Sequence, residues 1–230
     1  MKAAITFIIL AVITASVRVL GEEKKVLDIN GDPVIIGKPY YIKPVYDFGE
    51  GVRLSFFRPD LEHPCPQLAV LSGSPLISPR EPVAFYTEES VHTQEFGGFV
   101  YESTQLLFDF QRMDDFCPGQ TGHWKLNHLS EDLYPQITGK GHTDQGSDPF
   151  EIKKWKGRYL IYYYESDVRV RKHRIGEEII YYLEVSPSGD LFQVDFVPVT
   201  VDTTLSVKRS VFNRMASNGT KVSNRKYLMS

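Results

Sequence analysis

Few side chains in this 230-residue chain are spaced as an active site would require. The six histidines are scattered without the spacing of metal ligands, and a single histidine at a turn or on the surface is an ordinary residue. Asp114 and Asp115 are adjacent acids, but such pairs in turns are usually solvated rather than catalytic. The sequence contains neither a glycine-rich phosphate loop nor a Gly-x-Ser-x-Gly turn. It therefore predicts a protein that is not an enzyme and that holds no metal or cofactor.

Short β-prone runs recur along the chain, separated by Gly, Pro, Asn and Asp, and no stretch has a helical period of more than a few turns. The runs are 39–45, 67–71, 83–86, 99–101, 105–110, 124–127, 150–154, 158–164, 179–185 and 191–196. Many short strands with frequent turns predict an all-β fold. The pattern alone does not choose between a barrel and a sandwich.

The first 21 residues have the pattern of a secretory signal peptide. Lys2 provides the positive charge, and residues 3–15 form an apolar run that is too short to span a bilayer. Cleavage can follow Gly21 or lie nearer Ala15. We therefore predict an exported protein that is not in the membrane after cleavage.

The charge of the remaining chain is negative overall and positive at the C-terminus. Without residues 1–21, 24 basic and 29 acidic side chains remain, so nucleic acid is a poor candidate partner. Residues 208–230 form a basic tail without acidic residues, which is either a solvated extension or a binding arm. Asn218, in the sequence Asn-Gly-Thr, is a candidate glycosylation site for an exported chain.

Residues 26–42 predict a strand, a tight turn around Asn30-Gly31-Asp32, and a second strand that begins near Tyr40. In order and spacing this segment resembles the opening motif of the plant Kunitz-type (soybean trypsin inhibitor) family. The resemblance implies a β-trefoil over residues 22–207. A β-trefoil is a closed six-stranded barrel capped by three hairpins with pseudo-three-fold symmetry.

The resemblance extends to the two cysteines. Cys65 precedes the Pro-x-Leu run at 66–68, and Cys117 precedes a Trp-Lys strand at 124–125, as in the family. This implies one disulfide between Cys65 and Cys117, while two buried free thiols are the alternative. The second bridge of the family has no counterpart in this sequence.

The resemblance also implies a reactive-site loop at residues 86–99. The family landmarks correspond to 82–85 before the loop and 100–104 after it, which makes Phe96 the primary residue, flanked by Glu95 and Gly97. Phe suits an apolar protease pocket, and the alternative is that Phe96 packs back onto the barrel. The loop has no Lys or Arg, and its glutamates would be repelled by an acidic, trypsin-like pocket.

Two further features affect how this chain would inhibit. Ile36 stands where the family usually has a loop-bracing Asn, and its side chain cannot donate a hydrogen bond; Gly97 and the next glycine would loosen the loop further. Residues 167–174 carry four basic side chains, and we expect an alternative basic loop there. Arg171 or Lys172 could enter a trypsin-like pocket, the patch could bind an acidic partner, or the segment is a solvated hairpin tip.

Together with the predicted signal peptide, the resemblance implies a monomeric, secreted protease inhibitor that binds a serine endopeptidase in the apoplast or the vacuole. The family serves in defence and in the control of endogenous proteases. The alternative is a non-inhibitory β-trefoil that acts in storage or in carbohydrate or protein binding.

Overall fold

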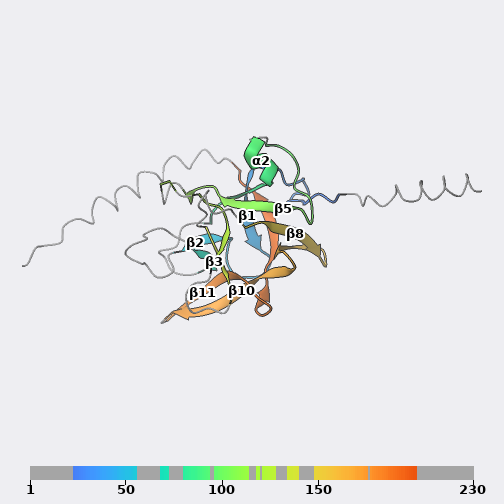
Figure 1. Ribbon diagram of the computed structural model, residues 1–230. Coiled ribbons are helices and arrows are strands. Elements are labelled where there is room, and N and C mark those ends of the chain that lie inside the picture. Colours follow the sequence, from blue (N-terminus) through green and yellow to red (C-terminus); the bar gives the residue numbers. More distant parts are fainter. Residues whose placement is uncertain are drawn as a thin grey trace, which may run out of the picture. The chain divides into compact units, whose positions relative to one another are not determined.

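The computed structural model describes most of the chain between residues 23 and 200 (Figure 1). The described residues are 23–55, 68–72, 80–93, 96–113, 118–119, 121–127, 134–139, 148–175 and 177–200. Five predictions fall outside these ranges and stay predictions. They are the signal peptide 1–21, the Cys65–Cys117 disulfide, the role of Glu95, the glycosylation of Asn218 and the basic tail 208–230.

The N-terminal segment forms the predicted turn. The carboxylate of Asp28 accepts hydrogen bonds from the backbone N–H groups of Asn30, at 2.8 Å, and Asp32, at 3.1 Å. Gly31, at the tip, has a φ of +85°, which glycine adopts without steric cost. The chain then returns, and Leu27 pairs with Pro33 in an isolated antiparallel bridge.

Two tyrosine hydroxyls from the barrel bind this segment. The N–H of Leu27 donates to the hydroxyl of Tyr159 at 3.0 Å, and the N–H of Ile35 donates to the hydroxyl of Tyr40 at 3.1 Å. Burial raises the pKa of Tyr40, which keeps its hydroxyl neutral. The N-terminal segment contributes only backbone N–H groups to these two hydrogen bonds, so the bonds do not depend on the side chains of Leu27 and Ile35.

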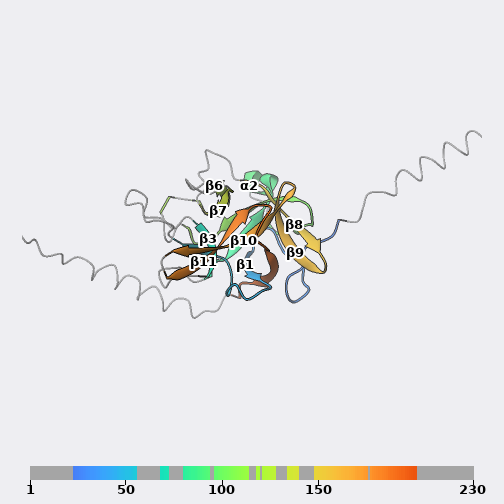
Figure 2. The ribbon, with the colours of Figure 1, turned by 90° about the horizontal axis from the view of Figure 1, so that it is seen from below.

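Six antiparallel strands form a closed barrel. Each strand pairs with the next in a ring, and the ring closes because β13 pairs with both β9 and β1. Figure 2 shows β8 and β9 side by side, as their register requires. The strands are β1 (Pro39–Pro44), β4 (Val83–Tyr86), β5 (Gln105–Phe110), β8 (Phe150–Trp155), β9 (Arg158–Tyr163) and β13 (Gln193–Pro198).

Three hairpins form the cap of the barrel. Their inner strands pair with one another in a second ring, in which β3 contacts β7, β7 contacts β11 and β11 contacts β3. This three-way pairing confirms the expected all-β barrel with three hairpins. The hairpins are β2 (Arg53–Ser55) with β3 (Leu68–Ser72), β6 (Lys125–Asn127) with β7 (Gln136–Thr138), and β10 (Ser166–Ile175) with β11 (Glu178–Val185). A short strand, β12 (Asp190–Leu191), pairs with β10.

Aromatic side chains fill the barrel. The rings of Phe85 and Phe108 meet edge to face at 4.8 Å between centroids, and Trp124 lies 4.9 Å from Phe108. Phe196 contacts Phe85 from the closing strand at 5.4 Å. Such pairs each contribute roughly 0.5–1.5 kcal/mol beyond the burial of their surface. The barrel is therefore a rigid support for the connections at its ends.

Candidate reactive-site loop

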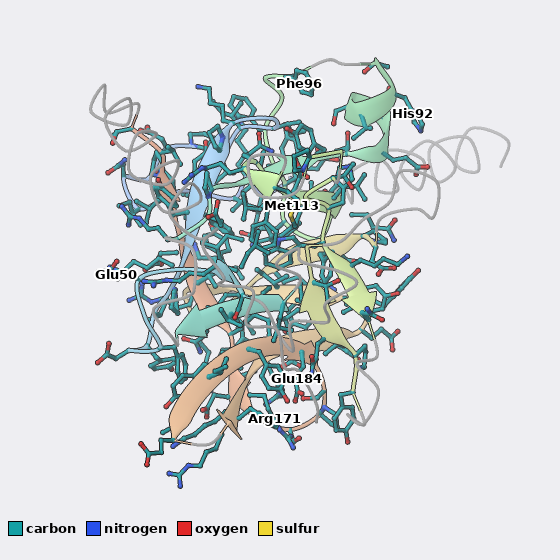
Figure 3. The ribbon with its side chains drawn as sticks, turned by 90° about the vertical axis from the view of Figure 1, so that its left-hand side faces the viewer. Glu50, His92, Phe96, Met113, Arg171 and Glu184 are labelled. Carbon is teal, nitrogen blue, oxygen red and sulfur yellow. The ribbon has the colours of Figure 1, made fainter. Side chains whose placement is uncertain are left out.

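The predicted loop connects two neighbouring barrel strands. β4 and β5 are paired from Val83 with Phe110 to Tyr86 with Leu107, so both ends of the connection are fixed. The connection begins with a short helix, α2 (Glu88–Thr93), which the sequence analysis did not predict. Figure 3 shows His92 and Phe96 together at one end of the described fold.

Reciprocal hydrogen bonds start the helix. The hydroxyl of Thr87 accepts the N–H of Ser90 at 3.0 Å, and the hydroxyl of Ser90 accepts the N–H of Thr87 at 2.9 Å. Glu88 and Glu89 follow in the first turn, where negative charge is favourable. The Thr-Glu-Glu-Ser sequence was the signal that could have revealed this helix.

The segment after the helix is bound to the N-terminal segment by its main chain. The N–H of Ile36 donates to the carbonyl of Gly98 at 2.8 Å, and the N–H of Gly97 donates to the carbonyl of Ile36 at 3.2 Å. The N–H of Val100 donates to the carbonyl of Val34 at 2.9 Å. The side chain of Ile36 makes no amide hydrogen bond, as expected, but the backbone of residue 36 braces this segment.

Phe96 is exposed and also contacts the barrel. Its exposed fraction is 59%, and its ring meets the ring of Tyr86 edge to face at 5.7 Å between centroids. The ring also lies directly against Gly37. The ring of Phe96 therefore rests on the body of the protein while the residue remains largely exposed, and its entry into a protease pocket stays a prediction.

A polar cluster supports Tyr86 at the end of β4. The side-chain amide of Gln111 donates to the hydroxyl of Tyr86 at 3.4 Å and to a carboxylate oxygen of Asp109 at 2.7 Å. The other oxygen of Asp109 lies 3.5 Å from Nδ1 of His123. Burial raises the pKa of Asp109, and His123 opposes this shift. Burial likewise raises the pKa of the Tyr86 hydroxyl, so the cluster presents a neutral phenol beneath Phe96.

The basic segment is not a loop. Residues 167–174 lie within β10. Asp167 pairs with β9 and residues 168–174 pair one by one with β11, so the predicted basic loop is wrong as local structure. Arg171 lies 3.6 Å from the carboxylate of Glu184, which is 2% exposed, and donates to the hydroxyl of Ser188 at 3.1 Å. Lys172 is exposed on the opposite face of the same strand.

Neither a metal site nor a membrane span occurs in the described part of the chain. Within those ranges, no three His, Cys, Asp or Glu side chains come together as metal ligands. None of the helices described is long and apolar enough to cross a bilayer.

The sequence and the fold were compared with known proteins. The profile of the Kunitz legume family, described as "Trypsin and protease inhibitor", matches residues 26–197. The chain belongs to this family. The match begins at the N-terminal segment that braces Gly97 and Gly98 and ends in the strand that closes the barrel. Kunitz family members are inhibitors rather than enzymes. A search of the curated proteins found no match.

Solved structures share the fold of this Kunitz protein at low sequence identity. The water-soluble chlorophyll protein of Brassica oleracea, with chlorophyll b, is 22% identical with a TM-score of 0.59. BBKI, in complex with bovine trypsin, is 23% identical with a TM-score of 0.55; each of these two matches covers 77% of this chain and 99% of the other. The potato cysteine protease inhibitor PCPI-3 is 21% identical with a TM-score of 0.57, covering 79% of this chain and all of the other. The common fold is the β-trefoil, and it carries different functions.

Proposed function

We propose that the protein is a secreted inhibitor of a serine endopeptidase with an apolar primary pocket, and that Phe96 is the side chain that enters this pocket. The observation that carries the proposal is the combination of an exposed Phe96 ring with a braced backbone at Gly97 and Gly98. A segment that is ordered before binding loses little conformational entropy when it enters a cleft, so its affinity is high.

Several features favour an apolar pocket over an acidic one. The described residues of the connection carry Glu88 and Glu89 on exposed positions and contain no Lys or Arg. An acidic pocket would repel these carboxylates, whereas a phenylalanine ring gains from burial in an apolar slot. BBKI, which has a similar fold, forms a complex with trypsin, and this supports a serine protease as the partner.

The test is a titration of the mature protein against trypsin-, chymotrypsin-, subtilisin-, cysteine- and carboxypeptidase-type enzymes. We expect tight inhibition of the chymotrypsin type, with Phe96→Ala weakening it at least ~30-fold because a central side chain is lost. Val91→Ala is the matched control, because Val91 is an exposed apolar residue of the same connection. Inhibition that survives Phe96→Ala unchanged contradicts the proposed role of Phe96.

The fold comparisons favour one second function. The chlorophyll protein shares this fold without being named an inhibitor, so a non-inhibitory binding or storage role is the alternative. If no protease class in the panel is inhibited, this alternative replaces the proposal, and a glycan array then tests carbohydrate binding.

Export and compartment are part of the proposal. The apolar run at 3–15 supports entry into the secretory pathway, with the apoplast or the vacuole as destination and a monomer as the working form. Expression of the full chain in plant cells, followed by N-terminal sequencing, should find the chain cut after Gly21 or nearer Ala15. An intact N-terminus on intracellular protein contradicts export.

A further inference from the structure

Gly37 occupies an unusual position beside the candidate loop. It lies between the Ile36 brace and β1, its φ is +79°, and its N–H donates to the carbonyl of Phe85 at 2.9 Å. A side chain at this position would begin in contact with Phe96. A Cβ added to Gly37 would lie 2.9 Å from Cδ1, 3.0 Å from Cγ and 3.1 Å from Cβ of Phe96.

The ring of Phe96 therefore uses the space that a side chain at residue 37 would fill. Real Cβ atoms essentially never approach a ring carbon as closely as 2.9 Å, so an alanine at residue 37 and the observed ring position exclude each other. The ring is also in contact with Tyr86, which belongs to a barrel strand. Gly37 and Tyr86 together hold the ring against two fixed parts of the fold.

We propose that Gly37 is a positioning residue for Phe96. Because Gly37 has no side chain, it leaves a space, here called the seat, that holds the Phe96 ring in one orientation before a protease binds. The role of the ring in inhibition rests on the proposed function, whereas the seat itself is a property of the free protein. A ring that is already ordered loses less side-chain entropy when it enters a pocket. Loss of the seat should therefore weaken inhibition without changing the chemistry of the loop.

Gly31 provides a matched control for the backbone strain of the substitution. Its φ of +85° is close to that of Gly37, but a Cβ added there would meet nothing within 4 Å. Gly31→Ala and Gly37→Ala therefore share the cost of an alanine at positive φ. Only Gly37→Ala also displaces the Phe96 ring.

The experiment measures both variants in two ways. In the free protein, NMR contacts between the ring protons of Phe96 and those of Tyr86 should be as strong in Gly31→Ala as in the wild type, and weaker in Gly37→Ala. Against the chymotrypsin-type protease, Gly37→Ala should raise the inhibition constant about tenfold, whereas Gly31→Ala should change it less than about twofold. Equal inhibition constants for the two variants, or tighter inhibition by Gly37→Ala, overturn the proposal.

The two readouts separate this proposal from the proposed function. If the wild type inhibits no protease, the proposed function fails, and the ring contacts in the free protein still decide whether Gly37 seats Phe96. If Gly37→Ala unfolds, the substitution is made in a Phe96→Gly background, where neither the ring nor the Cβ of residue 96 opposes the added Cβ. The melting temperature should then fall by the same amount for Gly37→Ala as for Gly31→Ala, and a larger fall for Gly37→Ala contradicts the seat.

Discussion

The β4–β5 connection and the β10–β11 hairpin were both candidates for binding a protease, and they differ in how their backbones are used. In the first, the main chain at Gly97 and Gly98 is braced by Ile36, and the Phe96 ring is exposed. In the second, the backbone of residues 168–175 is paired along its length with β11, and Arg171 is turned toward the buried Glu184. Figure 3 shows the two regions at opposite ends of the described fold.

This difference shows that a charged segment of the sequence is not necessarily a segment whose backbone is free to bind a protease. A substrate-like inhibitor must present an extended segment to the partner's cleft. The main chain of β10 already forms a ladder with β11 and also pairs with β9 and β12, so it is not free to extend into a protease cleft. The basic hairpin therefore stabilises the cap, whereas the apolar connection remains the candidate for recognition.

The largest expected effect sharpens this comparison by changing the chemistry of residue 96. Phe96→Arg should lose at least ~30-fold in inhibition of the chymotrypsin-type protease and gain measurable inhibition of trypsin, because Arg suits a pocket with a carboxylate at its base. Titration of both enzymes measures the exchange. The same substitution at Val91 is the control, and a trypsin gain there as large as at residue 96 contradicts the assignment.

The next effect concerns the stability of the hairpin. Glu184 is buried and accepts a hydrogen bond of 2.6 Å from the hydroxyl of Ser186. Glu184→Ala should lower the free energy of unfolding by about 2–3 kcal/mol, since a buried polar network loses its acceptor. Chemical denaturation measures this change, with inhibition remaining at the wild-type level.

Glu50 supplies the exposed counterpart for that measurement. Its side chain is 81% exposed and lies 3.6 Å from Arg53. Exposed ion pairs contribute little, so Glu50→Ala should change stability by less than about 1 kcal/mol. Equal losses for the two variants contradict a structural role for Glu184.

A smaller effect depends on pH and tests the cluster beneath Phe96. Burial raises the pKa of Asp109 above its ordinary value of 3.8, so the folded state favours the protonated carboxyl. The stability of the wild type therefore decreases as the pH rises through the raised pKa, and Asp109→Asn removes this dependence. The melting temperature of the variant relative to the wild type should increase as the pH rises above the ordinary carboxyl pKa of 3.8. A difference that is constant or decreases above this pH contradicts the raised pKa.

The smallest expected effect is at the basic hairpin. Arg171→Ala combined with Lys172→Ala should change inhibition by less than about twofold, because neither side chain lies on the recognition segment. Inhibition constants for trypsin- and chymotrypsin-type enzymes measure this. A large loss for either enzyme would break the comparison and return the hairpin to the role of a reactive site.

The sequence pattern predicted short strands because their signals are local, and the family resemblance supplied the barrel. The Asp28 turn, the alternating buried residues of β1 and β5 and the continuous apolar run of β4 depend on neighbouring residues, and the structure has them where they were expected. It missed α2 because a helix of six residues has little periodicity. It misread β10 because basic residues occupy both faces of the strand beyond Val170, which hides the alternation of a half-buried strand.

The contacts that define the site could not be predicted, because they join distant parts of the chain. The brace between Ile36 and Gly98 uses main-chain groups, so no residue type at position 36 reveals it. The fit of the Phe96 ring against Gly37 depends on an absent side chain. The family resemblance pointed to Phe96 as a candidate, and only the structure shows its contact with Gly37.

The most direct test of the central claim is to find which bond a protease cleaves when it binds this protein. A substrate-like inhibitor incubated for a long time with a trace of the chymotrypsin-type enzyme is cut slowly in its recognition segment. Mass spectrometry of the wild type should find one cut, between Phe96 and Gly97, with the protein still folded and inhibitory. Inhibition accompanied by a cut elsewhere, above all within β10, would contradict the account.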